Sequence, residues 1–118
     1  MKVIFSVFLG LFVQLSALAQ SDVASYPNKP IRLVVTTAAG GGSDAIARPL
    51  ESKFSEFLGQ PVIIDNRPGA SGMIAMDLVA KAPADGYTLV FATTGTVATN
   101  YALHEKISYN PLKDYEPV

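Results

Sequence analysis

The chain is short, nearly neutral and free of cysteine. Its 118 residues carry nine Lys and Arg against ten Asp and Glu, for a formal net charge of −1. Because no basic patch is present, the composition does not indicate a nucleic-acid partner. Without cysteine the chain has no disulfide framework, thiolate nucleophile or thiolate metal site. A chain of this length can bury one modest hydrophobic core.

The first 19 residues have the pattern of a secretory signal peptide. Lys2 supplies a weak positive charge, Val3 to Leu15 form an almost unbroken apolar run, and Ala17-Leu18-Ala19 is a small-x-small cleavage motif. The apolar run is shorter than the ~20 residues that a membrane-spanning helix requires. We therefore expect residues 1–19 to be removed on export and the mature chain, residues 20–118, to begin at Gln20.

Residues 31–61 predict a strand followed by a helix. Ile31 to Val35 is a near-continuous apolar run, which is typical of a buried parallel strand. Ser43 is a candidate cap for the following helix, which Gly59 and Pro61 would end. Pro49 lies inside this helix, so we expect a kink there or a later start. The residues at apolar helical spacing are Ile46, Ala47, Leu50, Phe54, Phe57 and Leu58.

Residues 62–92 continue the alternation of strands and helices. We expect strands over 62–65 and 87–92, and between them a helix over 72–81 with Ile74, Leu78 and Val79 facing inward. This order predicts an α/β fold with a parallel sheet flanked by helices. Ligands bind at the carboxyl ends of the strands in such sheets. The candidate segments at that edge are therefore 36–43, 66–71 and 93–100.

Several polar and aromatic residues have structural roles as their simplest interpretation. Asp44, Asp65 and Asp85 are expected to lie in a first helical turn, at a strand end and in a turn, and His104 is expected to be solvated. Tyr101, Tyr109 and Tyr115 are expected to pack with a polar tip. No set of these residues forms a recognisable catalytic motif.

Three consecutive glycines, Gly40 to Gly42, separate the first strand from the first helix. Glycine lets a backbone approach a ligand closely, and the free N–H groups at a helix N-terminus attract anions. A carboxylate or phosphate would fit such a loop, although a tight turn without any ligand has the same composition.

The glycine loop also satisfies a formal dinucleotide-binding fingerprint. Residues 40–45 match G-x-G-x-x-A, and Asp65 closes the next strand. Four residues separate the strand from the first glycine, however, and Asp44 would place a negative charge beside a pyrophosphate. We interpret the match as a false positive and do not expect an enzyme. A small exported α/β enzyme or nucleotide-binding protein that uses Gly40 to Gly42 remains the alternative.

Six spaced blocks of the chain resemble the Bug family, the TctC-like periplasmic solute receptors of tripartite tricarboxylate transporters. The blocks are Tyr26-Pro27-x-Lys29-Pro30-Ile31-Arg32, Ala38-Ala39-Gly40-Gly41-Gly42-x-Asp44, Leu58-Gly59-Gln60-Pro61-Val62, Asn66-Arg67-Pro68-Gly69-Ala70, Ala80-Lys81-Ala82-x-x-Asp85-Gly86-Tyr87-Thr88-Leu89 and Tyr109-Asn110-Pro111-x-Lys113-Asp114. Together they span the expected mature chain.

The resemblance implies a periplasmic binding protein of type II architecture with two lobes and no cofactor. Such a receptor acts as a monomer in the periplasm, closes on a small organic carboxylate and presents it to a membrane permease. Family members are much longer than this chain. Residues 20–118 are therefore expected to be the front part of the first lobe, with the rest of that lobe and the second lobe missing.

The resemblance also implies which residues meet the ligand. These are Ala38, Ala39, Gly40, Gly41, Gly42, Ser43 and Asp44 after the first strand, and Thr93, Thr94, Gly95, Thr96 and Asn100 after the third. Asp44 is expected to organise its loop, since direct contact between two carboxylates is repulsive. This chain departs from the family pattern at Thr36-Thr37, usually Pro-Phe, at Ser71, usually Gly, and at Tyr101, often Pro.

Overall fold

The computed structural model describes residues 25–118, so the expected signal peptide lies outside the described residues. Strands and helices alternate along this part of the chain. In order they are β1 (Ile31–Val35), α2 (Gly42–Leu58), β2 (Val62–Asn66), the 3₁₀ turn η3 (Ala70–Gly72), α3 (Met73–Ala80), β3 (Thr88–Phe91), the π-helical turn η4 (Gly95–Thr99) and α4 (Asn100–Leu103).

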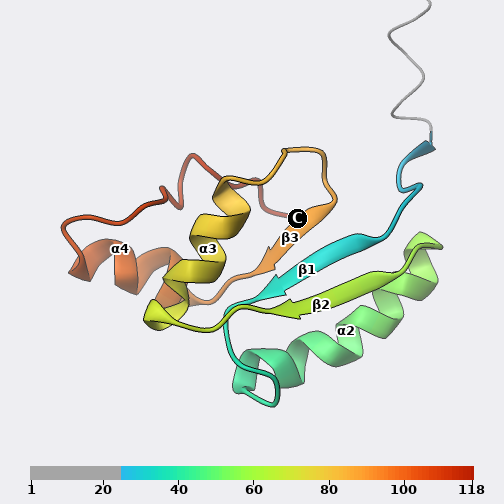
Figure 1. Ribbon diagram of the computed structural model, residues 1–118, viewed down its shortest axis with the longest axis horizontal. Coiled ribbons are helices and arrows are strands. Elements are labelled where there is room, and N and C mark those ends of the chain that lie inside the picture. Colours follow the sequence, from blue (N-terminus) through green and yellow to red (C-terminus); the bar gives the residue numbers. More distant parts are fainter. Residues whose placement is uncertain (1–24) are drawn as a thin grey trace, which may run out of the picture.

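The three strands form one parallel sheet in the order β2-β1-β3. Leu33 of the central strand lies opposite Ile64 of β2 and Leu89 of β3. Figure 1 shows α2 on one face of this sheet and α3 on the other. The predicted parallel α/β architecture is confirmed, and the carboxyl ends of all three strands lie at one edge.

Apolar side chains fill both interfaces between the sheet and its helices. On the α2 face the buried cluster consists of Ile31, Leu33, Val35, Ala47 and Val62. Alternate residues of a strand point to opposite faces, so the fully buried Val34 faces α3, where Ala75 and Met76 are also buried. These two small cores fix the loops at the carboxyl edge.

Two predictions about the first half of helix α2 are wrong. Its N-cap is Gly41, with no side-chain cap, because Ser43 lies inside the first helical turn. The helix also runs from Gly42 through Pro49 without interruption, so the predicted late start is wrong. The predicted end is confirmed, since Gly59 takes the left-handed conformation at φ 66°.

Helix α3 begins at Met73, and its inward face matches the prediction only in part, since Leu78 and Val79 are partly buried as expected. Ile74 is exposed, while Ala75 and Met76 are buried. The helix follows a run of left-handed residues from Gly69 to Gly72. This run directly precedes the helix, and apolar spacing alone does not reveal where the helix begins.

The aromatic residues of the last segment divide into two groups. Tyr109 is buried and donates a hydrogen bond to the Thr96 carbonyl at 2.5 Å, and the half-buried Tyr115 donates one to the Met76 carbonyl at 2.7 Å. Tyr101 is exposed on the four-residue helix α4, so its predicted packing role is wrong. No helix within residues 25–118 is long and apolar enough to cross a membrane.

Candidate ligand site at the carboxyl edge of the sheet

Three loops meet at the carboxyl edge, one after each strand. Gly72, which precedes α3, lies between Thr36 at the end of β1 and Thr96 in η4. A Cβ on Gly72 would lie 2.6 Å from Thr96 Cγ2 and 3.2 Å from Thr36 Cβ. Gly72 also has φ +85°, which side chains rarely adopt. Both the close approach and the backbone conformation therefore require glycine at this position.

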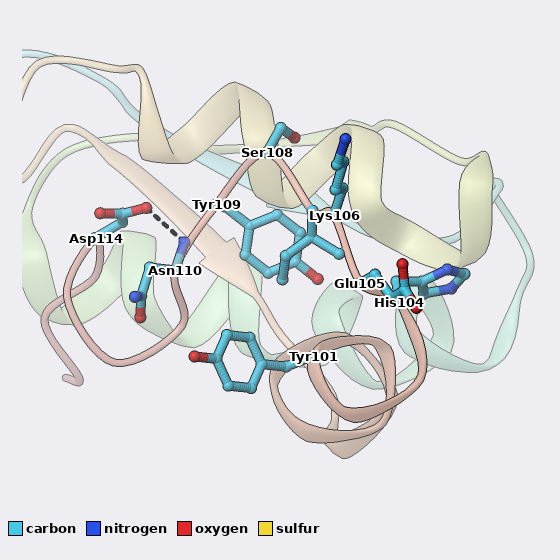
Figure 2. A pocket seen from close by; sticks show the side chains of 9 residues that line it. Tyr101, His104, Glu105, Lys106, Ser108, Tyr109, Asn110 and Asp114 are labelled. Carbon is cyan, nitrogen blue, oxygen red and sulfur yellow. Dashed lines mark hydrogen bonds between the residues drawn. The ribbon is translucent and has the colours of Figure 1, made fainter.

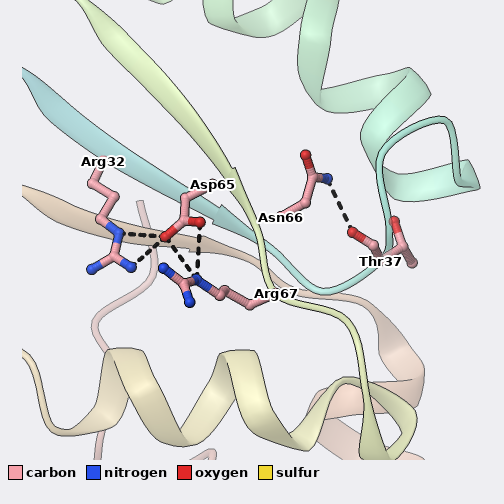
Figure 3. A network of polar contacts seen from close by, with 5 residues as sticks. All are labelled: Arg32, Thr37, Asp65, Asn66 and Arg67. Atoms are coloured by element: carbon pink, nitrogen blue, oxygen red, sulfur yellow. Dashed lines mark hydrogen bonds and ion pairs between the residues drawn. The ribbon is translucent and has the colours of Figure 1, made fainter.

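Two asparagine side chains tie the three loops together. The Asn66 amide donates to the Thr37 carbonyl at 3.0 Å, as Figure 3 shows, and to Asp44 Oδ1 at 2.9 Å. The Asn100 amide donates to the Ser71 carbonyl at 2.9 Å. Asn100 is only 6% exposed, so its side chain braces the backbone from inside. The predicted site residue Asn100 is therefore committed to holding a neighbouring loop.

Asp44 is directed into the protein. Its side chain is almost fully buried and accepts hydrogen bonds from the Gly40 N–H and Arg48 Nε, both at 2.8 Å, besides the one from Asn66. The Gly40 N–H, the Asn66 amide and Arg48 lower the pKa of this carboxyl to about 2. Because these donors neutralise the carboxylate, it organises the glycine loop without repelling an anion outside it.

The glycine loop presents N–H groups at the start of α2. The Gly41 N–H donates to the Ala38 carbonyl, and Ala45 is the first helical residue whose N–H bonds back, to the Gly41 carbonyl. The N–H groups of Gly42 to Asp44 therefore have no acceptor within the helix. A Cβ on Gly41 would lie 2.9 Å from the Ala38 carbonyl oxygen, whereas one on Gly42 would contact nothing within 4 Å.

The hydroxyl groups near this edge fall into two classes. Thr96 Oγ1 accepts from the Thr93 N–H at 3.0 Å and donates to the Thr93 carbonyl at 2.9 Å, so it orders its own turn. Ser43 is 8% exposed, yet its hydroxyl has no hydrogen-bond partner within residues 25–118. Of the other predicted site residues, Ala38, Ala39, Thr94 and Gly95 are exposed, and Thr93 is partly buried.

Sequence reasoning missed three residues that shape this edge. Thr36 contacts the meeting point of the loops, Asn66 joins the first two loops, and Ser71 accepts the Asn100 hydrogen bond. The available signal was that all three fall within the candidate edge segments 36–43 and 66–71. The pairing that gives each its role depends on the tertiary structure.

The open groove in Figure 2 lies elsewhere, between α4 and the segment that follows it. It has a volume of about 700 Å³ and is lined by residues between Tyr101 and Asp114. None of the twelve predicted site residues lines it. His104, which lines it, is exposed as predicted. Within residues 25–118, no group of three or more His, Asp or Glu side chains is placed to hold a metal ion.

The dinucleotide-binding alternative requires an acidic residue at the end of β2 that is free to bind a ribose, and Asp65 is not free in this structure. Asp65, which would have to meet a ribose, accepts hydrogen bonds from Arg32 and from Arg67 Nε, the latter at 2.9 Å (Figure 3). Burial raises the pKa of Asp65, but the two guanidinium groups outweigh it and the net shift is downward. The carboxylate is therefore engaged by two arginines, and the Gly40 N–H is engaged by Asp44.

Comparison with known proteins identifies the family. The model of the tripartite tricarboxylate transporter family receptor, TctC, matches residues 46–118. The chain belongs to this family. The family is one of transporter receptors, so the enzyme alternative is wrong. A curated relative, protein BugT from Bordetella pertussis, is 38% identical over 93% of this chain and 34% of its own. The chain spans about a third of the length of the curated relatives it matches.

Three solved structures share the fold of most of the described residues. MatC from Rhodopseudomonas palustris, solved with malate, is 40% identical with a TM-score of 0.76 over 79% of this chain and 32% of its own. An R. palustris protein with adipate is 44% identical, with a TM-score of 0.70 over 74% and 29%. The periplasmic binding protein BugD is 37% identical, with a TM-score of 0.74 over 78% and 30%.

Proposed function

We propose that this chain forms part of the ligand-binding lobe of a periplasmic receptor that captures a small organic carboxylate for the permease of a tripartite tricarboxylate transporter. The main support is the N-terminus of α2, where unpaired N–H groups follow a glycine loop whose acid is already neutralised. The proposed ligand-binding residues are Ala38, Ala39, Gly40, Gly41, Gly42, Ser43, Asp44, Thr93, Thr94, Gly95, Thr96 and Asn100.

The first wall of the proposed site holds a ligand carboxylate through N–H groups. Gly42 to Asp44 lie at the positive end of the α2 dipole, which favours an anion without a cationic side chain. Arg48 is the nearest guanidinium on this helix, and its Nε is bonded to Asp44. The ligand charge is therefore balanced by oriented backbone dipoles, while the protein charges balance one another.

The second wall is the turn after β3. Thr94 and Gly95 are exposed there, and the internal hydrogen bonds of Thr96 keep the turn in one conformation. Asp44, Thr96 and Asn100 serve the site from behind, since their polar side-chain atoms bond to the protein. Rigid loops of this kind bind with a smaller entropic penalty than mobile ones.

The periplasmic location and the permease partner are proposed from the family and from the expected signal peptide at residues 1–19. BugD is a periplasmic binding protein, and the family description names a transporter receptor. MatC and the R. palustris neighbour were solved with malate and adipate, both small dicarboxylates. We propose the same chemical class of ligand for the protein that carries this sequence.

A substitution at Gly42 tests the proposal. Gly42 lacks a left-handed φ, and a Cβ there meets no atom within 4 Å, so Gly42→Val leaves the fold intact while its side chain covers the N–H groups. Loss of one or two charge-assisted hydrogen bonds at about 1.5–3 kcal/mol each lowers carboxylate affinity by about tenfold or more. Calorimetric titration of the whole mature protein that carries this sequence measures the effect with malate, succinate, adipate and citrate.

The matched control is Ser52→Val, which places the same side chain on the exposed middle of α2. It should leave both affinity and melting temperature close to those of the wild type. NAD and ATP are included in the titrations. A wild-type protein that binds these nucleotides and ignores the carboxylates would contradict the proposed function, as would a stable Gly42→Val variant with unchanged affinity.

A further inference from the structure

Thr36 carries a buried hydroxyl that the described fold does not use. The residue follows β1 directly and is 6% exposed, yet its Oγ1 has no hydrogen-bond partner within residues 25–118. Thr96, equally buried at 3%, uses its hydroxyl in two hydrogen bonds. Because no protein group among the described residues pairs with it, this hydroxyl depends on water or on a bound ligand for its hydrogen bond.

The neighbouring Thr37 shows which of the two hydroxyls a ligand can reach. Thr37 Oγ1 is also unpaired, but it is fully closed off from solvent. It lies under the glycine loop, 3.0 Å from where a Cβ on Gly41 would stand. The Thr36 oxygen is not among the closed-off atoms, so it is the accessible hydroxyl of the pair.

The position of Thr36 is at the meeting point of the three loops. Its Cβ lies 3.2 Å from a Cβ placed on Gly72, whose other close neighbour is Thr96. The central strand β1 ends here, with β2 on one side and β3 on the other. The loop that begins with Thr36 leads directly to the N-terminus of α2, so Thr36 lies at the same edge of the sheet as the proposed carboxylate site.

We propose that the Thr36 hydroxyl donates a hydrogen bond to an oxygen of the bound carboxylate ligand, which makes Thr36 a specificity-determining residue of this site. The inference rests on the proposed function. The oxygen belongs to the ligand's carboxylate or to a hydroxyl on its carbon chain. A site that hydrogen-bonds a ligand hydroxyl discriminates against the analogue that lacks it, because the buried protein group is then left unpaired.

The test replaces Thr36 by valine, which keeps the shape of the side chain and removes only the hydroxyl. In the whole mature protein that carries this sequence, affinities for malate, succinate and adipate are measured by calorimetric titration. We expect an affinity loss of about tenfold for at least one of these ligands. The melting temperature without ligand should stay the same or rise, since an unpaired hydroxyl is removed.

The three ligands separate the two possible oxygens. A loss confined to malate, which differs from succinate by one hydroxyl, assigns the Thr36 bond to the ligand hydroxyl. An equal loss for all three assigns it to the shared carboxylate. Either result supports the contact, because a residue with only a structural role would not lower affinity while leaving the unliganded protein as stable as before.

Two controls bracket the result. Thr37→Val removes the neighbouring closed-off hydroxyl and should leave affinity unchanged, whereas Thr36→Ser keeps the hydroxyl and should retain binding. If Thr36→Val lowers the melting temperature, Thr36→Ala compared with Thr36→Ser still isolates the hydroxyl. If the variants without the hydroxyl bind every ligand as tightly as the wild type, the Thr36 contact is wrong but the proposed function stands. If the wild-type protein binds none of the three ligands, the proposed function is wrong as well.

Discussion

Asp44 places a negative charge beside a loop suited to anions. Three hydrogen-bond donors around its carboxylate offset that charge. The Gly40 N–H, Asn66 and Arg48 all donate to its carboxylate. The hydrogen bond to Gly40 fixes the glycine whose φ of +81° turns the loop. The acid is thus tied to the glycine loop that leads into α2, and its three donors favour the ionised form.

We predict that Asp44→Asn destabilises the protein in a pH-dependent manner. The pKa of Asp44 is lowered from 3.8 to about 2, so the stability it contributes is fully present above about pH 4 and is lost as the pH falls toward 2. An asparagine amide keeps only one acceptor oxygen, so at least one of the three donors, Gly40, Arg48 or Asn66, would face an N–H group. Thermal melts between pH 2 and 7 should show a variant several degrees less stable at pH 7, with the difference closing below pH 4.

The control for this prediction is Glu56→Gln on the exposed surface of α2. Glu56 pairs with Lys53 at 3.1 Å, and both side chains are well exposed, so this ion pair contributes little. Its loss should leave the melting temperature nearly unchanged at every pH. A difference between Asp44→Asn and the wild type that stays constant from pH 7 to pH 2 would show that the charge of Asp44 is unimportant.

At the scale of elements, the sequence predicted what depends on local pattern. The strands at 31–35, 62–65 and 87–92 were found within two residues of their observed ends, because buried parallel strands have apolar runs bounded by glycine, proline and polar residues. The end of α2 at Gly59 followed from the left-handed conformation that glycine favours. Three such strands separated by helices were enough to give the sheet.

What the sequence could not supply depends on contacts between elements. The start of α3 follows a left-handed run that contains Ala70 and Ser71, at φ 47° and 54°, residues that rarely take this conformation. The hydrogen bonds of the candidate site also depend on contacts between elements, so the sequence could not predict them. Ser43 was predicted from its position and stays a prediction, but the bonds that commit Thr96 and Asn100 to the framework required the folded chain.

The junction between α2 and β2 gives a prediction at this scale. Ser55 Oγ accepts the Val62 N–H at 2.8 Å and donates to the Glu51 carbonyl at 2.8 Å, which ties the last turns of the helix to the start of the strand. Ser55→Ala leaves the partly buried Val62 N–H without that acceptor. We expect a loss of about 1–3 kcal/mol in the free energy of unfolding, measured by urea denaturation.

Ser52→Ala is the matched control for Ser55→Ala. Ser52 lies one turn earlier on the same helix and is exposed, so its replacement by a better helix former should leave stability unchanged or slightly higher. Equal stability of Ser55→Ala and Ser52→Ala would mean that the bond to Val62 contributes nothing to the junction.

At the scale of the whole molecule, α2 carries an uncovered apolar stripe. Ile46, Leu50, Phe54 and Phe57 are 59%, 36%, 41% and 87% exposed. Their spacing of four, four and three residues places them on one side of the helix, next to the side that packs on the sheet. Contiguous exposed apolar surface of this kind promotes association or the binding of apolar probes.

We predict that residues 20–118, prepared alone, self-associate through this stripe and bind an apolar dye. A double substitution, Ile46→Glu with Phe57→Glu, should reduce both effects without lowering the melting temperature, because these two side chains are the most exposed of the stripe. Sedimentation over a range of protein concentrations and dye fluorescence measure the outcome. The control double substitution, Ala45→Glu with Ser52→Glu, adds the same charge at exposed positions away from the stripe. If both double variants dissociate equally, net charge rather than the stripe governs association, and a monomeric wild-type chain without dye binding would contradict the prediction outright.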